Sequence, residues 1–140
     1  MTNKELEYHK AYLRMAVVWA DLSKSKRNNV GALIVKDGMI ISDGFNGTPT
    51  GFPNDCEDVD GSTHWYVLHA EANAILKCAK HGTACKGANL YLTLSPCKEC
   101  SKLIIQSSIK RVIYMEQYRD LDGLKMLKSV GVDVIQLNDI

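Results

Sequence analysis

Apolar and polar positions follow two periods in the first third of the chain. Residues 4–23 carry apolar side chains at helical spacing, which predicts a first helix. Residues 30–36 and 39–45 are apolar-rich runs separated only by Asp37 and Gly38. This dipeptide is typical of a two-residue hairpin turn, so an antiparallel pair of strands is predicted to follow the helix.

The second half of the chain alternates between helix and strand patterns. A helix is predicted to begin near His69, run to about Lys80 and be ended by Gly82. The elements predicted after it are strand 89–94, helix 97–107, strand 110–115, helix 121–130 and strand 132–137. Such alternation implies parallel neighbouring strands with helices on both faces of the sheet. We therefore expect residues 1–140 to form a single three-layer α/β/α domain around a five-stranded mixed sheet.

A long polar segment, residues 46–64, separates the hairpin from the second half. It holds two of the three prolines and shows neither the spacing of a helix nor the alternation of a strand, so it is predicted to be a loop. Loops of this length inside a small domain are usually functional.

Composition excludes some classes of partner. Seventeen Lys and Arg against sixteen Asp and Glu give a net charge of +1, without the basic excess of a polynucleotide-binding protein. A small charged ligand needs only one or two basic residues and stays possible. No stretch approaches about 18 apolar residues and the N-terminus lacks a signal-peptide pattern, so a cytoplasmic protein is expected. Its five cysteines are then better interpreted as thiols or metal ligands than as disulfides.

Two cysteines in the segment SPCKEC, residues 95–100, have metal-ligand spacing. Cys97 and Cys100 are three positions apart and share one face of a helix. Ser95 is a favourable N-cap and Pro96 a favourable first helical residue, which places both cysteines in the opening turns. The positive end of the helix there favours thiolates.

The third candidate ligand is His69, at the start of the helix that follows the long loop. Two cysteines and one histidine leave the fourth tetrahedral position open, as in catalytic rather than structural zinc sites. Glu71 would be the base that takes a proton from water acidified by the metal. Positions 69 and 71 lie about 200° apart around a helix, so both face the metal only if the cavity lies at the helix mouth.

The cysteines and histidines also allow other interpretations. A lone C-x-x-C also suits redox chemistry or a structural zinc knuckle. The fuller pattern H-x-E followed by P-C-x-x-C, present as His69-Ala-Glu71 and Pro96-Cys-x-x-Cys100, is the signature of zinc deaminases. A second metal at Cys78, His81 and Cys85 is disfavoured, because free cysteines are often simply buried. His9 is predicted to be a surface position. Cys56 and His64 lack a ligand set, but the place of His64 in the long loop leaves a minor role at the site open.

The motifs together resemble a known family. HAEANAIL (69–76) and SPCKEC resemble the cytidine and deoxycytidylate deaminase superfamily. GFNGTPTGFP (44–53) looks like the G-Y-N-G-x-P-x-G loop of its deoxycytidylate branch, and SIKRVIYMEQY (108–118) is similar to another segment of that branch. The resemblance covers about residues 24–137. It implies a cytidine-deaminase-like fold and zinc-dependent hydrolysis of dCMP to dUMP and ammonia.

The resemblance also implies roles for individual residues. His69, Cys97 and Cys100 match the zinc ligands and Glu71 the proton shuttle. The implied substrate-binding residues are Arg27, Asn46, Ala70, Ser95, Tyr118 and Arg119, with Arg27 and Arg119 as phosphate contacts, and the implied effector loop contains Gly47, Thr48 and Gly51. Without the resemblance, the basic residues 24–27 would suit a solvated turn, the glycines and Asn46 a tight turn, and Tyr118 packing.

Regulation and assembly are implied by the resemblance alone. It implies activation by dCTP, inhibition by dTTP, Mg²⁺ on the triphosphate, a homohexamer, and supply of dUMP for thymidylate synthesis. The chain departs from the family pattern at Phe45, where Tyr is usual, and at Tyr66, where many bacterial members carry Arg. The extra ligands of a second, structural zinc are absent, so one zinc per subunit is expected.

Three rival functions use the same motifs. An RNA-editing deaminase is disfavoured by the near-neutral charge, and a deaminase that accepts dCTP as well as dCMP is poorly separated by sequence. A non-catalytic zinc module is disfavoured because a structural site needs no carboxylate such as Glu71.

Overall fold

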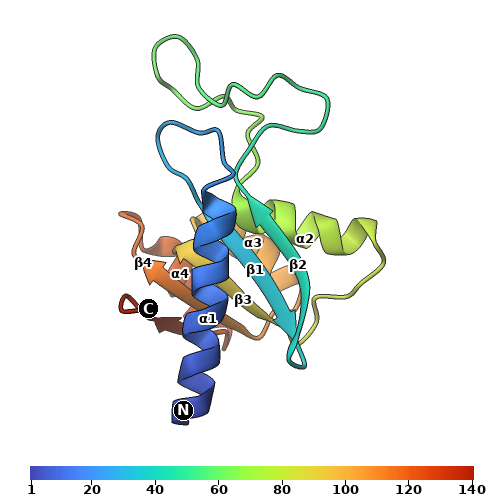
Figure 1. The fold of residues 1–140 in the computed structure, drawn as a ribbon, viewed down its shortest axis with the longest axis vertical. Helices are drawn as coiled ribbons and strands as arrows, with labels where there is room; N and C mark the ends of the chain where they lie inside the picture. The colour runs from blue at the N-terminus through green and yellow to red at the C-terminus, as the bar shows by residue number, and fades with distance from the viewer.

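A computed structural model describes all 140 residues and contains four helices and five strands (Figure 1). The helices are α1 (Asn3–Ala20), α2 (Ala70–Lys80), α3 (Lys98–Gln106) and α4 (Asp122–Ser129). The strands are β1 (Gly31–Lys36), β2 (Met39–Phe45), β3 (Asn89–Leu94), β4 (Arg111–Glu116) and β5 (Asp133–Gln136). Every predicted element is present. None of the helices combines the length and the apolar character that crossing a membrane requires.

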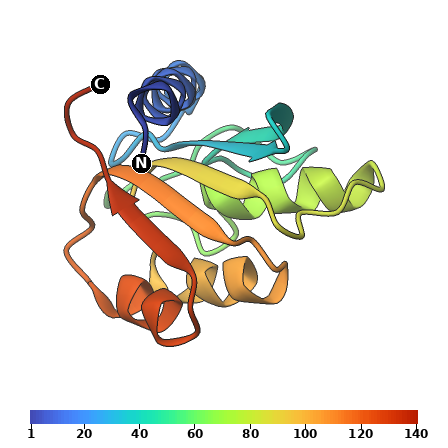
Figure 2. The ribbon, with the colours of Figure 1, turned by 90° about the horizontal axis from the view of Figure 1, so that it is seen from below.

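The strands form one mixed sheet in the order β2-β1-β3-β4-β5. Strand β1 is antiparallel to both β2 and β3, whereas β3, β4 and β5 are parallel to one another. Helix α1 covers one face of the sheet and the other three helices cover the opposite face (Figure 2). The predicted three-layer α/β/α arrangement around a five-stranded sheet is therefore confirmed.

Each face of the sheet has its own apolar core. The core beneath α1 contains Leu13, Leu33, Val35, Tyr91 and Ile113. On the opposite face fifteen buried residues pack together between the sheet and α2, α3 and α4. Strand β1 contributes to both cores, because alternate residues of a strand point to opposite faces.

The hairpin turn has the predicted form. Asp37 and Gly38 both adopt positive φ, 51° and 75°, as a type I′ turn requires. The first helix, in contrast, was predicted too long. It ends at Ala20 instead of continuing to residue 23, because the backbone turns there and the Ser23 hydroxyl donates to the Asn46 carbonyl at 2.8 Å. This bond ties the segment after α1 to the end of β2.

Sheet topology determines where the connections meet. Because β1 runs opposite to β3, its amino end lies at the same edge of the sheet as the carboxyl ends of β3 and β4. Residues 21–30 and 46–69 therefore come together with the shorter connections 95–97 and 117–121. The two longer connections form the top of the molecule in Figure 1.

The prediction that His9 is a surface position is wrong. His9 is only 6% exposed, and its Nδ1 lies 2.7 Å from the Tyr91 hydroxyl of β3. His9 shares the inward face of α1 with Leu13, Ala16 and Ala20, which follow it at helical spacing. A neutral imidazole is favoured at this position, because burial and the nearby Arg111 charge lower the pKa of His9.

This buried histidine predicts a pH dependence of stability. Below its ordinary pKa of 6.5, His9 binds a proton in the unfolded chain, whereas the buried ring stays neutral until the pH reaches its lowered folded-state pKa. The unfolded state binds more protons in this window, so the free energy of unfolding should fall as the pH falls below 6.5. Urea unfolding of the parent and His9→Gln proteins at pH values on either side of 6.5 measures the effect. Equal pH slopes in the two proteins would contradict it.

Candidate active site

Helix α2 begins at the edge of the sheet where the connections meet. His69 is its N-cap, with extended backbone angles of φ −75° and ψ 158°. The long loop is closed at its base by two hydrogen bonds between the backbones of Gly47 and Leu68, 3.0 and 2.8 Å long, which deliver His69 to the helix mouth. A Cβ on Gly44 would lie 2.5 Å from the Ala70 carbonyl oxygen, so glycine permits the start of α2 to pack directly on β2.

Helix α3 begins at Lys98, one residue after the predicted bound and two residues after Pro96, the expected first helical residue. Its N-cap is Cys97, with φ −71° and ψ 170°, so the prediction of Ser95 as N-cap and Pro96 as first helical residue is wrong. Ser95 continues the end of β3, where its backbone N–H donates to the Glu116 carbonyl and its hydroxyl accepts from the Tyr118 N–H at 2.7 Å. The shift leaves Cys97 and Cys100 in the opening turn, as expected.

The two helix mouths bring three metal-ligating side chains together. The His69 Nδ1 lies 3.3 Å from the Cys100 Sγ and 3.5 Å from the Cys97 Sγ. All three donor atoms lie within 4.8 Å of one another. Zinc bonds of about 2.3 Å to sulfur and about 2.0 Å to nitrogen at a tetrahedral angle separate such atoms by about 3.5 Å. The donor atoms therefore fit a tetrahedral zinc ion with one position left for a non-protein ligand.

The electrostatics of this cluster also favour a cation. Hydrogen bonds from the Cys100 thiol and from His69 lower the pKa of Cys97 to about 4. The same thiolate raises the pKa of its partner Cys100, with burial as a second cause, and raises that of His69. Two neighbouring thiolates repel each other, so the pair loses its second proton readily only when a positive ion lies between them.

Glu71 lies within the same opening of α2. Its side chain is 3% exposed, and burial raises the pKa of its carboxyl. Glu71 and His69 both line a cavity of about 420 Å³ at the helix mouth. Residues two apart on a helix can both face a cavity that lies at the helix mouth, and His69 and Glu71 do so here. A carboxyl held there with a raised pKa is suited to accept and return a proton.

The cavity gathers most of the predicted site residues. Cys97 lines it, while Cys100 is buried beside it within the metal cluster. The predicted substrate-binding residues in its wall are Arg27, Asn46, Ala70, Ser95, Tyr118 and Arg119. The effector-loop residues Gly47, Thr48 and Gly51 are not part of this wall.

Comparison with known proteins identifies the family. Residues 6–116 match the model of the cytidine and deoxycytidylate deaminase zinc-binding region. The chain belongs to this family. A probable deoxycytidylate deaminase of Caenorhabditis elegans is 40% identical over an alignment of 126 residues. This alignment covers 86% of this chain but only 63% of that relative's length. The deoxycytidylate deaminase of Enterobacteria phage T4 is 33% identical, with 89% of this chain and 87% of that protein covered.

A solved structure in this family is also similar. The dCMP deaminase of cyanophage S-TIM5, in complex with dCMP and dUMP, superposes with a TM-score of 0.92 at 44% sequence identity. The superposition covers 98% of this chain and 99% of that one. The cytidine-deaminase-like fold implied by the sequence is thereby confirmed for this member of the family.

In this deaminase-family chain Asn46 lines the cavity and also holds segment 23–30 in place through its side-chain amide. Its Oδ1 accepts a hydrogen bond from the Val30 N–H at 2.9 Å, and its Nδ2 donates to the Asn28 carbonyl at 2.7 Å. An amide has two N–H groups and two acceptor positions. One of each is left for a ligand, so Asn46 can fix segment 23–30 and contact a substrate at once.

Several residues of the cavity wall were not predicted from the sequence. They are Ser25, Asn28, Val30, Thr63, Val67, Leu94 and Gln117. Most of them lie close in sequence to a predicted site residue. Their proximity to a motif is therefore the sequence feature that could have identified them. Thr63 is different, because it lies in the irregular part of the long loop, where its backbone pairs with that of Glu57.

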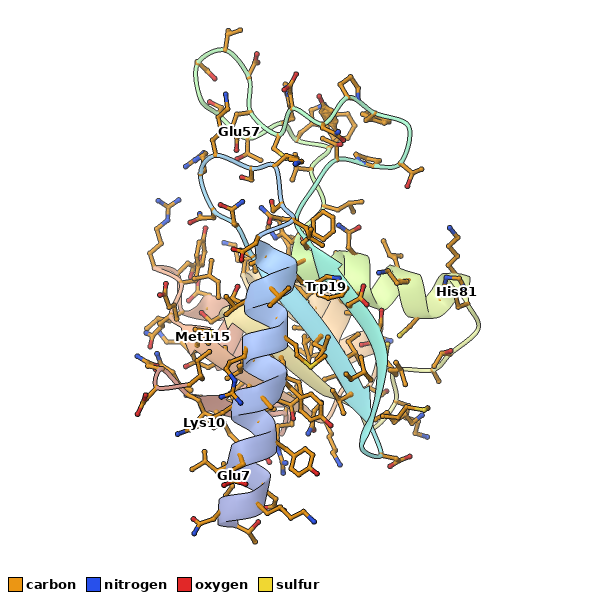
Figure 3. All side chains as sticks on the ribbon, in the orientation of Figure 1. Glu7, Lys10, Trp19, Glu57, His81 and Met115 are labelled. Carbon is orange, nitrogen blue, oxygen red and sulfur yellow. The ribbon has the colours of Figure 1, made fainter.

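The remaining cysteines and histidines stay outside the metal cluster. Cys78 and Cys85 are buried, and burial raises the pKa of Cys85 to about 12. His81 lies at the end of α2 (Figure 3). It is exposed and joins no group of three metal-ligating side chains. His64 packs against Tyr66 with ring centroids 4.7 Å apart. The interpretation of Cys78 as a packed helix residue is therefore confirmed.

Proposed function

We propose that this chain hydrolyses dCMP to dUMP and ammonia. The observation that carries the proposal is the buried Glu71 carboxyl in the cavity that His69 and Cys97 line, with the third zinc-ligating side chain, Cys100, directly beside it. A structural zinc site needs four protein ligands and no proton carrier. The similarity to the dCMP deaminase of cyanophage S-TIM5 supports dCMP as the substrate.

The metal ligands and Glu71 have different roles in the proposed reaction. His69, Cys97 and Cys100 would hold a zinc ion, which when bound would supply a Lewis acid that makes water acidic near neutral pH. Glu71 takes the proton of the attacking water and gives it to ring N3, which makes C4 of the cytosine more electrophilic. The water oxygen then bonds to C4. Glu71 takes the second proton from this oxygen and passes it to the amino group, which leaves as ammonia as the C4–N bond breaks and the C4=O bond forms. The buried position of Glu71 keeps this proton from bulk water.

The outer part of the cavity suits the nucleotide's sugar and phosphate. Arg27 and Arg119 lie in the wall on two different connections, and guanidinium groups bind phosphate through paired hydrogen bonds. Tyr118 is held in place by the bond from its N–H to the buried Ser95 hydroxyl, so its ring can pack against the nucleotide. Asn46 offers its remaining N–H and acceptor to the sugar or base.

Substrate choice gives the direct test. We expect ammonia release with dCMP to exceed that with deoxycytidine by at least about tenfold in kcat/KM, because a lost phosphate contact costs about that much. Ammonia release with dCMP should also exceed that with dCTP or tRNA. Ammonia release should be measured on one preparation whose zinc content is read at the same time. Preference for dCTP would favour the bifunctional alternative, and deamination of tRNA alone would contradict the proposal.

We also propose that dCTP activates and dTTP inhibits this enzyme, with Mg²⁺ on the triphosphate, as part of a homohexamer that supplies dUMP for thymidylate synthesis. Gly47, Thr48 and Gly51 lie outside the cavity wall, and the Gly47 backbone pairs with Leu68, the residue before His69. A ligand on this loop could thus act on the mouth of α2. Titration of dTTP with Mg²⁺ into a steady-state assay tests the idea, and an unchanged rate at saturation would refute it. Analytical ultracentrifugation tests the hexamer.

A further inference from the structure

Segment 23–30 forms one wall of the cavity and has no regular secondary structure. Four of its residues, Ser25, Arg27, Asn28 and Val30, line the cavity. On its inner side it is fixed by Asn46, through the bonds to Asn28 and Val30. A wall without helix or strand keeps its shape only through such individual bonds.

On its outer side the segment is held by a single carboxylate, Glu57. Its Oε2 accepts a hydrogen bond from the Ser25 hydroxyl at 2.8 Å. The Lys26 N–H donates to Oε1 and Oε2 at 3.1 and 3.0 Å, and the Arg27 N–H donates to Oε2 at 3.4 Å. Figure 3 shows Glu57 between the long loop and the segment below it. One side chain of the long loop thus receives three successive donors of the cavity wall.

Glu57 lies 30 residues from the wall it holds and is not itself in the cavity wall. Its bridge to Thr63, which does line the cavity, anchors it within the long loop. The backbone of Glu57 is therefore fixed by the long loop, and its carboxylate is fixed by the donors of segment 23–30. Bonds from neutral donors to a charged acceptor are about twice as strong as neutral ones.

We propose that Glu57 is a positioning residue that sets the affinity for the substrate's phosphate by holding the backbone of Arg27 against the long loop. The proposal rests on the function proposed above, in which Arg27 meets the phosphate of dCMP. Glu57 touches no reacting atom and should leave the chemical step unchanged. Its effect should appear in KM for a phosphorylated substrate.

The sign of the effect separates positioning from simple electrostatics. Glu57 carries a negative charge close to a site that binds an anion, so removing the charge alone should lower KM for dCMP. Loss of positioning should raise KM, because Arg27 is no longer held. The variant Glu57→Gln keeps the size of the side chain but turns an acceptor into an NH₂ group that faces the donors. Asp55→Asn is the matched control, since it removes a charge from an exposed side chain two residues away.

The experiment compares the parent, Glu57→Gln and Asp55→Asn proteins with zinc bound. In Glu57→Gln we expect KM for dCMP to rise about tenfold with kcat within about twofold, as for the loss of a charged hydrogen bond that orients a binding group. Inhibition by dUMP should weaken by a similar factor, while inhibition by deoxyuridine, which has no phosphate, should not change. Asp55→Asn should show an equal or lower KM. A lower KM in both variants, or an equal loss of dUMP and deoxyuridine binding, would overturn the proposal.

Hydrogen exchange gives a second readout that does not depend on turnover. The Lys26 and Arg27 amides should exchange faster in Glu57→Gln than in the parent and in Asp55→Asn, while the β1 amides stay protected. Unchanged protection of these two amides would refute the role of Glu57 even if dCMP is the substrate. If the parent releases no ammonia from dCMP, the proposed function fails, and faster exchange would still show that Glu57 holds the wall.

Discussion

Replacement of Glu71 by glutamine should lower kcat for dCMP by about a thousandfold, within the range that positioned acid–base groups contribute. Glutamine fills the same space but cannot take a proton from water or return one to the leaving amine. The three metal-ligating side chains are untouched, so the zinc content should stay at that of the parent. Steady-state ammonia release and elemental analysis of the same sample measure both quantities.

A matched control for this variant is Glu99→Gln. Glu99 lies between Cys97 and Cys100 in the sequence, but its side chain is exposed and pairs only with Lys102. Its substitution should leave kcat and zinc content unchanged. Glu71→Gln with near-parental turnover would show that another group carries the proton, and Glu71→Gln without zinc would mean that the carboxyl supports the metal.

Replacement of Cys100 by alanine should abolish both zinc binding and ammonia release. Cys100 is the most buried of the three donors, and its removal leaves only His69 and Cys97 to hold the ion. Two ligands hold zinc far more weakly than three, and the Lewis acid needed for attack by water is then missing. Metal content by elemental analysis and turnover of dCMP provide the measurements.

Cys85→Ala is the control that removes a buried thiol outside the cluster. This variant should keep its zinc and its kcat and lose only some stability, because a small cavity replaces the sulfur. A strong chelator added to the parent should remove activity, and added zinc should restore it. Full activity after complete removal of zinc would contradict the metal assignment.

Much of the fold could be predicted from periodicity and turn chemistry. The bounds of β2 and β3 were predicted to the residue, since Asp37 and Gly38 define one turn and residues 89–94 stand between clear breaks. Errors arose where a tertiary contact overrides a local signal. Ser95 looks like an N-cap in isolation, but the N–H of Tyr118, 23 residues away, occupies its hydroxyl.

The core of the site was predictable because its residues occur in two short motifs. The spacing of His69 to Glu71 and of Cys97 to Cys100 carries the chemistry, and the structure places each pair at a helix mouth. The surrounding wall was less predictable. Nothing local in the sequence links Glu57 to Ser25, 32 residues away, since the pairing depends on how two irregular segments cross. His9 was mispredicted for the same reason, because its partner Tyr91 is 82 residues distant.

Because β1 runs opposite to β3, the end of the sheet that carries the β1–β2 turn lies away from the cavity. At the edge of the sheet opposite the cavity, the chain returns through short turns, among them Asp37-Gly38, whose residues are both exposed. An affinity tag or fluorescent reporter inserted between these two residues would project from the end of the sheet opposite the cavity. Sensors and immobilised forms of the protein are therefore best engineered through this hairpin.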